Sequence, residues 1–207
     1  MLLQKRLSDS AFNLILGGIV LYGLLANVLT ALIFGPLFRS VSSIGLSVGW
    51  VVCGIIGIFC GRSEKLWLRV LAFHLIVVPF GPMLAVILGA AGGAQVLLAI
   101  TLTAIITAGM ILLSSRFPDF FSRLGGVLLL SLSLTLVVSI VTFFLDIHLS
   151  ILSMIFILIF ALYIGYDWHK AQTCEKTVAN AIEAAIDLYL DIINIFLDLL
   201  DLLDWFD

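Results

Sequence analysis

The sequence predicts an all-α membrane protein with seven transmembrane helices. Of its 207 residues, 63% are hydrophobic and 11% are charged, whereas soluble domains average roughly 45–50% apolar and about 25% charged residues. The apolar residues form seven runs, each near the length of about 20 residues that a helix needs to cross a bilayer. These runs are continuous rather than alternating, which argues against a closed β-barrel, the other architecture that spans membranes.

The seven predicted spans follow one another along the chain with short connections. They cover residues 11–35, 41–60, 66–89, 94–114, 124–145, 149–166 and 180–203. Small residues mark the first two spans, which favours close helix packing. The third contains "PFGPML", from Pro79 to Leu84, whose two prolines predict a kink or an unwound turn. The connections are too short for a further domain, so residues 1–207 are predicted to form a single transmembrane domain.

The basic residues predict the orientation of the chain. With seven spans, nine of the ten lysines and arginines fall on one side of the membrane, and Arg39 alone falls on the other. Cytoplasmic loops carry the excess of Lys and Arg, so we expect a cytoplasmic N-terminus and a C-terminus outside. No small-residue cleavage site closes the apolar run after Lys5 and Arg6, which indicates an uncleaved first span rather than a signal peptide.

The last span is apolar on most of its circumference and acidic on one side. At about 100° per residue, six polar side chains fall within a stripe of about 80°, which we call the acidic seam: Glu183, Asp187, Asp191, Asn194, Asp198 and Asp201. The thirteen Leu, Ile and Phe residues between Ile182 and Leu203 favour insertion by about 6 kcal/mol. Three or four carboxylates at about 2.5–3.5 kcal/mol each cancel that gain. We therefore expect the seam to face other helices or water rather than lipid.

Two locations of this segment fit the pattern. One is an amphipathic helix on the membrane surface, but such helices usually carry Lys and Arg on their polar face, and residues 180–203 contain neither. The favoured alternative is a central helix whose acids line a polar interior. A row of carboxylates with no basic partner on its own helix prefers cations and is prone to share protons.

Asp167, in "LYIGYDWHKAQ", is the first charged residue after the sixth span. A solvated position at the membrane interface is the plainer interpretation of this residue. The connection to the last span lies on the predicted cytoplasmic side, however, and the last span begins there. We therefore expect Asp167 to lie near Asp187 or Asp191.

No catalytic or metal-binding motif accompanies these acids. The sequence has no Ser/His/Asp order, no HExxH, no CxxC pair and no phosphate-binding Gly-rich loop, so we expect neither an enzyme nor a cofactor. Cys53, Cys60 and Cys174 show no metal spacing and are interpreted as unpaired, small apolar residues. His74 is expected to be packed or hydrogen-bonded. No basic patch supports nucleic acid as a partner.

Four stretches resemble the Bax inhibitor-1 family of transmembrane Bax inhibitor motif proteins. "AAIDLYLDIINIFLDLL" is similar to the A-x-x-LYLDxxNxFL pattern of that family's last helix, and "LYIGYDWHKAQ" resembles the end of its sixth helix. "SSRFPDFFSRLGG", from Ser114 to Gly126, resembles the turn between its fourth and fifth helices. "FGPMLAVIL" is similar to its Pro-containing third helix. The first two spans carry no motif that we match to the family.

The resemblance implies six helices around a central, acidic seventh, and a pH-sensitive calcium leak channel of the bacterial plasma membrane. It implies that Asp167 and Asp191 form the proton sensor and gate, where Ca²⁺ is held transiently. Family members also have an arginine of the second helix that latches this pair in the closed state. The candidate latch here is Arg62, which follows the second span instead of lying inside it.

Asp187, Asp198 and Asp201 are expected to extend the cation path, because calcium prefers oxygen ligands. Ca²⁺ is then the permeant ion, protons are the regulator, and the protein is a monomer in the lipid bilayer. A non-transporting interaction protein is the first alternative, regulating a membrane protease or a stress or cell-death pathway, with a seam that only stabilises the bundle. A proton-coupled transporter is the second, and it predicts internal repeats, none of which is clear in the sequence.

Overall fold

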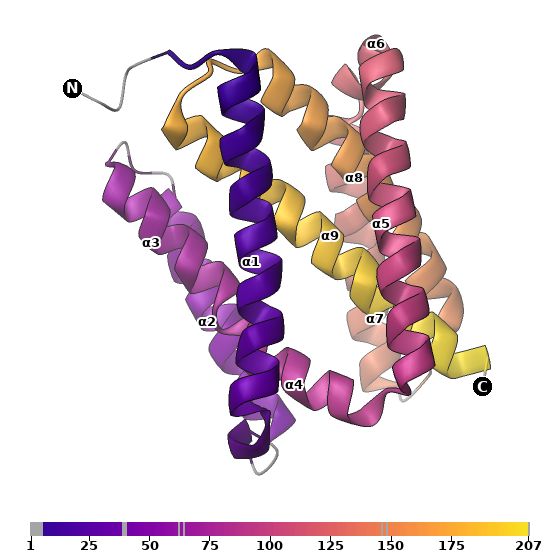
Figure 1. The fold of residues 1–207 in the computed structure, drawn as a ribbon. Coiled ribbons are helices and arrows are strands. Elements are labelled where there is room, and N and C mark those ends of the chain that lie inside the picture. The colour runs from indigo at the N-terminus through magenta and orange to yellow at the C-terminus, as the bar shows by residue number, and fades with distance from the viewer. Residues whose placement is uncertain are drawn as a thin grey trace. The chain divides into compact units, whose positions relative to one another are not determined.

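The computed structural model describes residues 6–38, 41–61, 63, 65–145, 147 and 149–206. Helices make up nearly all of this part of the chain, and no strand occurs in it (Figure 1). The predicted all-α class is therefore confirmed. The candidate latch Arg62 lies outside the described residues, as do Lys5 and Arg39, on which the predicted orientation partly depends.

Eight of the nine helices in the described part of the chain overlap the predicted apolar runs, and α6 lies in the predicted connection between residues 114 and 124. They are α1 (Asp9–Phe38), α2 (Ser43–Gly61), α3 (Leu66–Val77), α4 (Phe80–Ala90), α5 (Gly93–Arg116), α6 (Pro118–Ser122), α7 (Gly125–Phe144), α8 (Ser150–Thr173) and α9 (Val178–Phe206). In the described part of the chain, five segments are long and apolar enough to cross a membrane: α1, α3 with α4, α5, α7 and α8. Helix α2 is apolar but shorter, and α9 is long but rich in carboxylates. The count of seven transmembrane helices stays a prediction.

The third predicted span is interrupted at its prolines. Helix α3 ends at Val77, and α4 begins at Phe80. In the turn between them the backbone N–H of Gly81 donates to the carbonyl of Val78 at 3.1 Å. Pro79 has no N–H to donate, and its ring excludes the preceding turn of a regular helix. The predicted break is thus confirmed.

The described chain forms two compact units. The first contains Met1–Ala90 and Cys174–Tyr189, and the second contains Ala91–Thr173 and Leu190–Asp207. Within the first unit α1 packs along α4, and α2 packs along α3. Within the second unit α8 packs against α5, α6 and α7. The single-domain prediction stays untested, because α9 is one continuous helix that contributes to both units.

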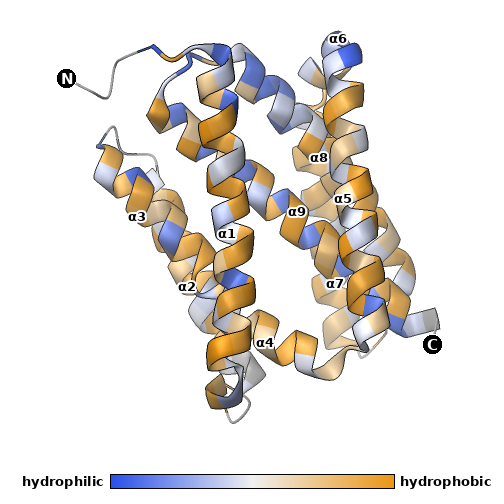
Figure 2. Cartoon of the chain, viewed as in Figure 1, coloured by the Kyte–Doolittle hydropathy of each residue, from blue (hydrophilic) through white to orange (hydrophobic). Residues whose placement is uncertain are grey.

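The helices carry many large apolar side chains on their outer surfaces, and apolar residues predominate on α1, α5 and α7 (Figure 2). Phe143 and Phe144 of α7, for example, are each 80% exposed. In water such surfaces would associate, whereas in a bilayer they contact acyl chains. This distribution agrees with the membrane class that the composition predicts.

Helix α9 buries the face opposite the acidic seam. Ala185, Tyr189, Phe196 and Leu200 are all buried, and at helical spacing they point away from the seam. The apolar face of α9 therefore packs against other helices. Along the seam, the exposure of the acids changes from buried Asp191 to exposed Asp201. The predicted arrangement of six helices around α9 stays a prediction.

Candidate functional site

The two predicted gate residues are both buried. Asp167 lies near the C-terminal end of α8 and is 8% exposed, and Asp191 lies in the middle of α9 and is 5% exposed. Both belong to the second unit. Carboxylates are rarely buried unless they are paired or hydrogen-bonded, because removing their charge from water is costly. We therefore expect Asp167 and Asp191 each to have a polar partner inside the protein.

Tyr163 lies within electrostatic range of both carboxylates. Its hydroxyl interacts electrostatically with both Asp167 and Asp191. Tyr163 precedes Asp167 by one helical turn, so both side chains lie on the same face of α8. A phenol can donate to a carboxylate and accept from a protonated carboxyl. We call Tyr163, Asp167 and Asp191 the buried aspartate cluster.

The seam continues beyond this cluster in the second unit. Asp201 accepts a hydrogen bond from Oγ of Ser153 in α8 at 2.5 Å, and Asp198 interacts electrostatically with Asp201. Nδ2 of Asn194 donates to the carbonyl of Leu190 at 2.8 Å. Asp198 is half-buried and Asp201 is exposed. The structure thus links the predicted path residues Asp198 and Asp201, and adds Ser153, which the sequence analysis missed.

The beginning of the seam lines a cavity of about 410 Å³ in the first unit. Its walls are Gly57, Ile58, Gly61, Arg69, Ile76, Glu183, Ile186 and Asp187. A water molecule occupies about 30 Å³ in the liquid, so this volume suffices for several waters around the predicted path residue Asp187. Gly57 permits the close approach of α2 and α3, because a Cβ there would lie 2.8 Å from Cγ1 of Ile76.

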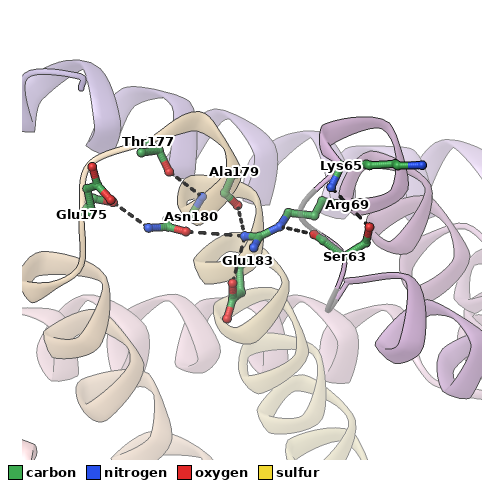
Figure 3. Close-up of polar contacts among 8 residues, drawn as sticks. All are labelled: Ser63, Lys65, Arg69, Glu175, Thr177, Ala179, Asn180 and Glu183. Atoms are coloured by element: carbon green, nitrogen blue, oxygen red, sulfur yellow. Dashed lines mark hydrogen bonds and ion pairs between the residues drawn. The ribbon is translucent and has the colours of Figure 1, made fainter. Parts of the chain in front are cut away.

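Arg69 joins the start of α3 to the start of α9 (Figure 3). Its Nη1 donates to the carbonyl of Ala179 at 3.1 Å and to Oε2 of Glu183 at 3.0 Å. Its Nε donates to the carbonyl of Ser63 at 3.0 Å. The Arg69 side chain is 16% exposed, whereas that of Glu183 is 50% exposed. In the sequence, Arg69 indicates only the orientation of the chain, and no pattern predicts this contact.

Helix α9 begins with an N-cap beside this contact. Thr177 Oγ1 accepts a hydrogen bond from the backbone N–H of Asn180 at 3.2 Å (Figure 3). Nδ2 of Asn180 also donates to the carbonyl of Glu175 at 2.8 Å. A Thr at the N-cap satisfies one of the backbone donors that a helix start leaves open. The start of the acidic helix is therefore fixed both by its own cap and by Arg69.

The structure also shows the surroundings of His74, Asn27 and the three cysteines. Nδ1 of His74 lies 2.8 Å from the carbonyl of Val70, and Nε2 lies 3.2 Å from the hydroxyl of Tyr22, so the hydrogen-bonded interpretation of His74 is confirmed. Buried Asn27 donates to the hydroxyl of Tyr189 in α9. None of the three cysteines forms a disulfide, as predicted.

Comparison with known proteins decides the family. The family model described as "Inhibitor of apoptosis-promoting Bax1" matches residues 4–207. The chain belongs to the Bax inhibitor-1 family. The match includes the first two spans, in which the sequence motifs had given no signal. With its long apolar helices, this Bax inhibitor-1 family member is an integral membrane protein.

The chain is also similar to two proteins of Helicobacter pylori, from strains J99 / ATCC 700824 and ATCC 700392 / 26695. Each is 27% identical over 128 residues, which cover 60% of this chain and 54% of the relative. The chain thus spans about half the length of these two relatives. Both carry the name "Uncharacterized protein", so neither supplies an activity.

Proposed function

We propose that this Bax inhibitor-1 family protein is a pH-sensitive calcium leak channel, gated by Asp167 and Asp191 at its cytoplasmic end. One observation carries the proposal: Asp167 and Asp191 are both buried, and both interact electrostatically with Tyr163. These are the positions that the family resemblance implies for the proton sensor.

The gating follows from the cost of burying charge. Two neighbouring carboxylates in a region of low dielectric repel each other, so the pair holds a proton more readily than two separate acids in water. With a shared proton, the carboxyls hydrogen-bond and hold α8 and α9 together. Without it, they repel each other, the helices part and the site attracts Ca²⁺. Tyr163 can bond to the cluster in either state, because its hydroxyl both donates and accepts.

The acidic seam supports a path for a hard cation. Asp187 lines the cavity in the first unit, and Asp198 and Asp201 follow Asp191 along the same face of α9. Carboxylate and amide oxygens are the ligands that Ca²⁺ prefers. In this proposal Ca²⁺ is the permeant ion, and it occupies Asp167 and Asp191 only transiently.

Calcium flux into vesicles tests the proposal. Purified protein is reconstituted in vesicles loaded with a calcium-sensitive dye, and flux is measured from about pH 5 to about pH 8. We expect flux to rise with pH and Asp191→Asn to abolish that dependence. Asp204→Asn, an exposed position of the same helix, is the matched control and should behave as the wild type. Absence of flux throughout, or an unaltered pH profile in Asp191→Asn, would contradict the proposal.

A non-transporting interaction protein is the second candidate. The hydrogen bond from Ser153 to Asp201 favours it, because this seam carboxylate contributes to helix packing. Co-purification with a membrane protease that Asp167→Asn leaves unchanged, together with a lack of calcium flux, would support this alternative over the channel.

A further inference from the structure

The second unit contains an entirely apolar cavity where α5, α6 and α8 meet. Its volume is about 410 Å³, and its walls are Met110, Leu113, Phe117, Phe120, Phe121 and Leu162. Water in a cavity needs two or more polar partners, and these side chains offer none beyond the weak thioether of Met110. A hydrocarbon chain, in contrast, gains dispersion contacts with every wall. The cavity therefore suits an acyl chain.

The phenylalanines of the cavity differ in exposure, because Phe121 is buried against α8 whereas Phe117 and Phe120 face outward. Phe121 is 2% exposed and packs against Gly165 of α8, where any Cβ would collide with its ring. The hydroxyl of Ser114 donates to the carbonyl of the same glycine at 2.6 Å. Phe117 and Phe120, in contrast, are 53% and 54% exposed. The short helix α6 is thus fixed on α8, while Phe117 and Phe120 form the exposed side of the cavity.

A positive charge lies at the rim of the cavity. The guanidinium carbon of Arg116 is 5.7 Å from the centre of the Phe117 ring, which is one of the cavity walls. Arg116 and Arg123 flank α6, and both are exposed. Asp119 lies between them, but it pairs with neither, and no other acid among the described residues does so. Two arginines against one aspartate leave this turn with a net positive charge, available to an anion.

Aromatic and basic side chains together mark this end of the unit as a membrane interface. Nε1 of Trp168 in α8 donates to Oγ of Ser115 in α5 at 3.3 Å, so the two helices end side by side. Tryptophan and tyrosine gather where a bilayer meets water, and Lys and Arg gather on the cytoplasmic side. That leaflet holds the anionic lipids, and basic pockets between helices bind their headgroups.

We propose that this turn is a binding site for an anionic phospholipid. The phosphate contacts Arg116, whose planar donors match phosphate oxygens in pairs, and one acyl chain of the same lipid fills the apolar cavity. Arg123 adds to the attraction from the other end of α6. The site is independent of the proposed channel activity, because it uses none of the residues of the acidic seam.

Native mass spectrometry of the full chain in detergent tests this site. The two probes are dioleoylphosphatidylglycerol, which is anionic, and dioleoylphosphatidylcholine, which has the same chains but no net charge. We expect the anionic lipid to bind more tightly. Arg116→Gln should weaken its binding about fivefold, which corresponds to the roughly 1 kcal/mol that each basic residue contributes at an anionic surface. The loss for the neutral lipid should be smaller, because its choline ammonium offsets the charge of the phosphate.

Two further variants separate the cavity from the charge. Leu113→Trp fills the cavity and should weaken both lipids, provided that its helical circular dichroism matches the wild type; if it does not, Arg116→Gln alone decides. Lys65→Gln, an exposed cation of the first unit, is the matched control and should change nothing. Equal binding of the two lipids, full affinity in Arg116→Gln, or an equal loss in Lys65→Gln would overturn the proposal.

Discussion

Asp191 differs from the other residues of the acidic seam in its burial. It is 5% exposed, whereas Asp187 and Asp198 are half-buried, and Glu183 and Asp201 are exposed. At the scale of single residues, this burial separates Asp191 from the more exposed acids of the seam, and the proton-sensing role proposed for Asp191 depends on it. A change at Asp191 should therefore alter both the thermal stability of the protein and the pH dependence of the proposed calcium flux.

Asp191→Asn should therefore stabilise the protein against heat. Asparagine keeps the shape of the side chain and can still form hydrogen bonds, but it carries no charge. Removing the buried charge should raise the free energy of unfolding by about 1–3 kcal/mol. The gain in unfolding temperature should grow as pH rises, because the charge of the wild-type aspartate is then fully developed. Thermal unfolding followed by tryptophan fluorescence in detergent measures it, and a gain that is equal at all pH values would contradict the expectation.

Gly165 allows Phe121 to pack against α8, so Gly165→Ala should destabilise the second unit. The added Cβ collides with the ring, and overpacking of this kind costs about 1–3 kcal/mol. Gly126→Ala is the matched control, because Gly126 also lies in a helix but has open space around its Cα. Alanine there should be neutral or stabilising by up to about 1 kcal/mol. The same unfolding temperature in both variants would show that the packing is not as described.

At the scale of elements, the sequence predicted the positions of the helices but not all of their contacts. The apolar runs and the prolines of "PFGPML" located each segment and the break between α3 and α4. Helix α6 was missed, because its five residues are too short for a periodic pattern. Tyr163 and Ser153 were missed because the seam was derived from α9 alone, although Tyr163 lies one turn before Asp167 and could have been found by that spacing.

The contact of Arg69 with α9 makes an element-scale prediction. Arg69→Ala removes donors to two backbone carbonyls and to Glu183, so hydrogen exchange of the first turns of α9 should accelerate. Glu183→Gln should have a smaller effect, below about 1 kcal/mol, because Glu183 is half exposed and water screens the pair. Hydrogen–deuterium exchange of the peptide from Val178 to Glu183 measures both. Equal acceleration in the two variants would place the stabilisation in the ion pair rather than in the carbonyl contacts.

At the scale of the whole molecule, sequence patterns predict a class and an orientation, while the arrangement of the helices depends on packing that no local pattern encodes. The distribution of Lys and Arg predicts seven spans, yet α9 falls outside the segments that length and hydropathy identify. Helix α9 fails these criteria because its carboxylates make it too polar. The predicted topology therefore needs its own test.

Reporter fusions to the C-terminus provide that test. With seven spans and a cytoplasmic N-terminus, the C-terminus lies outside, where alkaline phosphatase folds and green fluorescent protein does not fluoresce. A fusion after Arg123, in the predicted fourth connection, should show the opposite pattern. Fluorescence from the C-terminal fusion would indicate that α9 does not cross the membrane, as expected for the amphipathic surface helix.

Gating as proposed here requires that Asp167 and Asp191 hold α8 and α9 together through a shared proton. Experimental structures of the reconstituted protein at about pH 5 and at about pH 8 measure the separation of the two carboxyl groups directly. We expect hydrogen-bonding distance at the lower pH and a wider separation, with α8 and α9 displaced, at the higher pH. An unchanged separation at both pH values would contradict it.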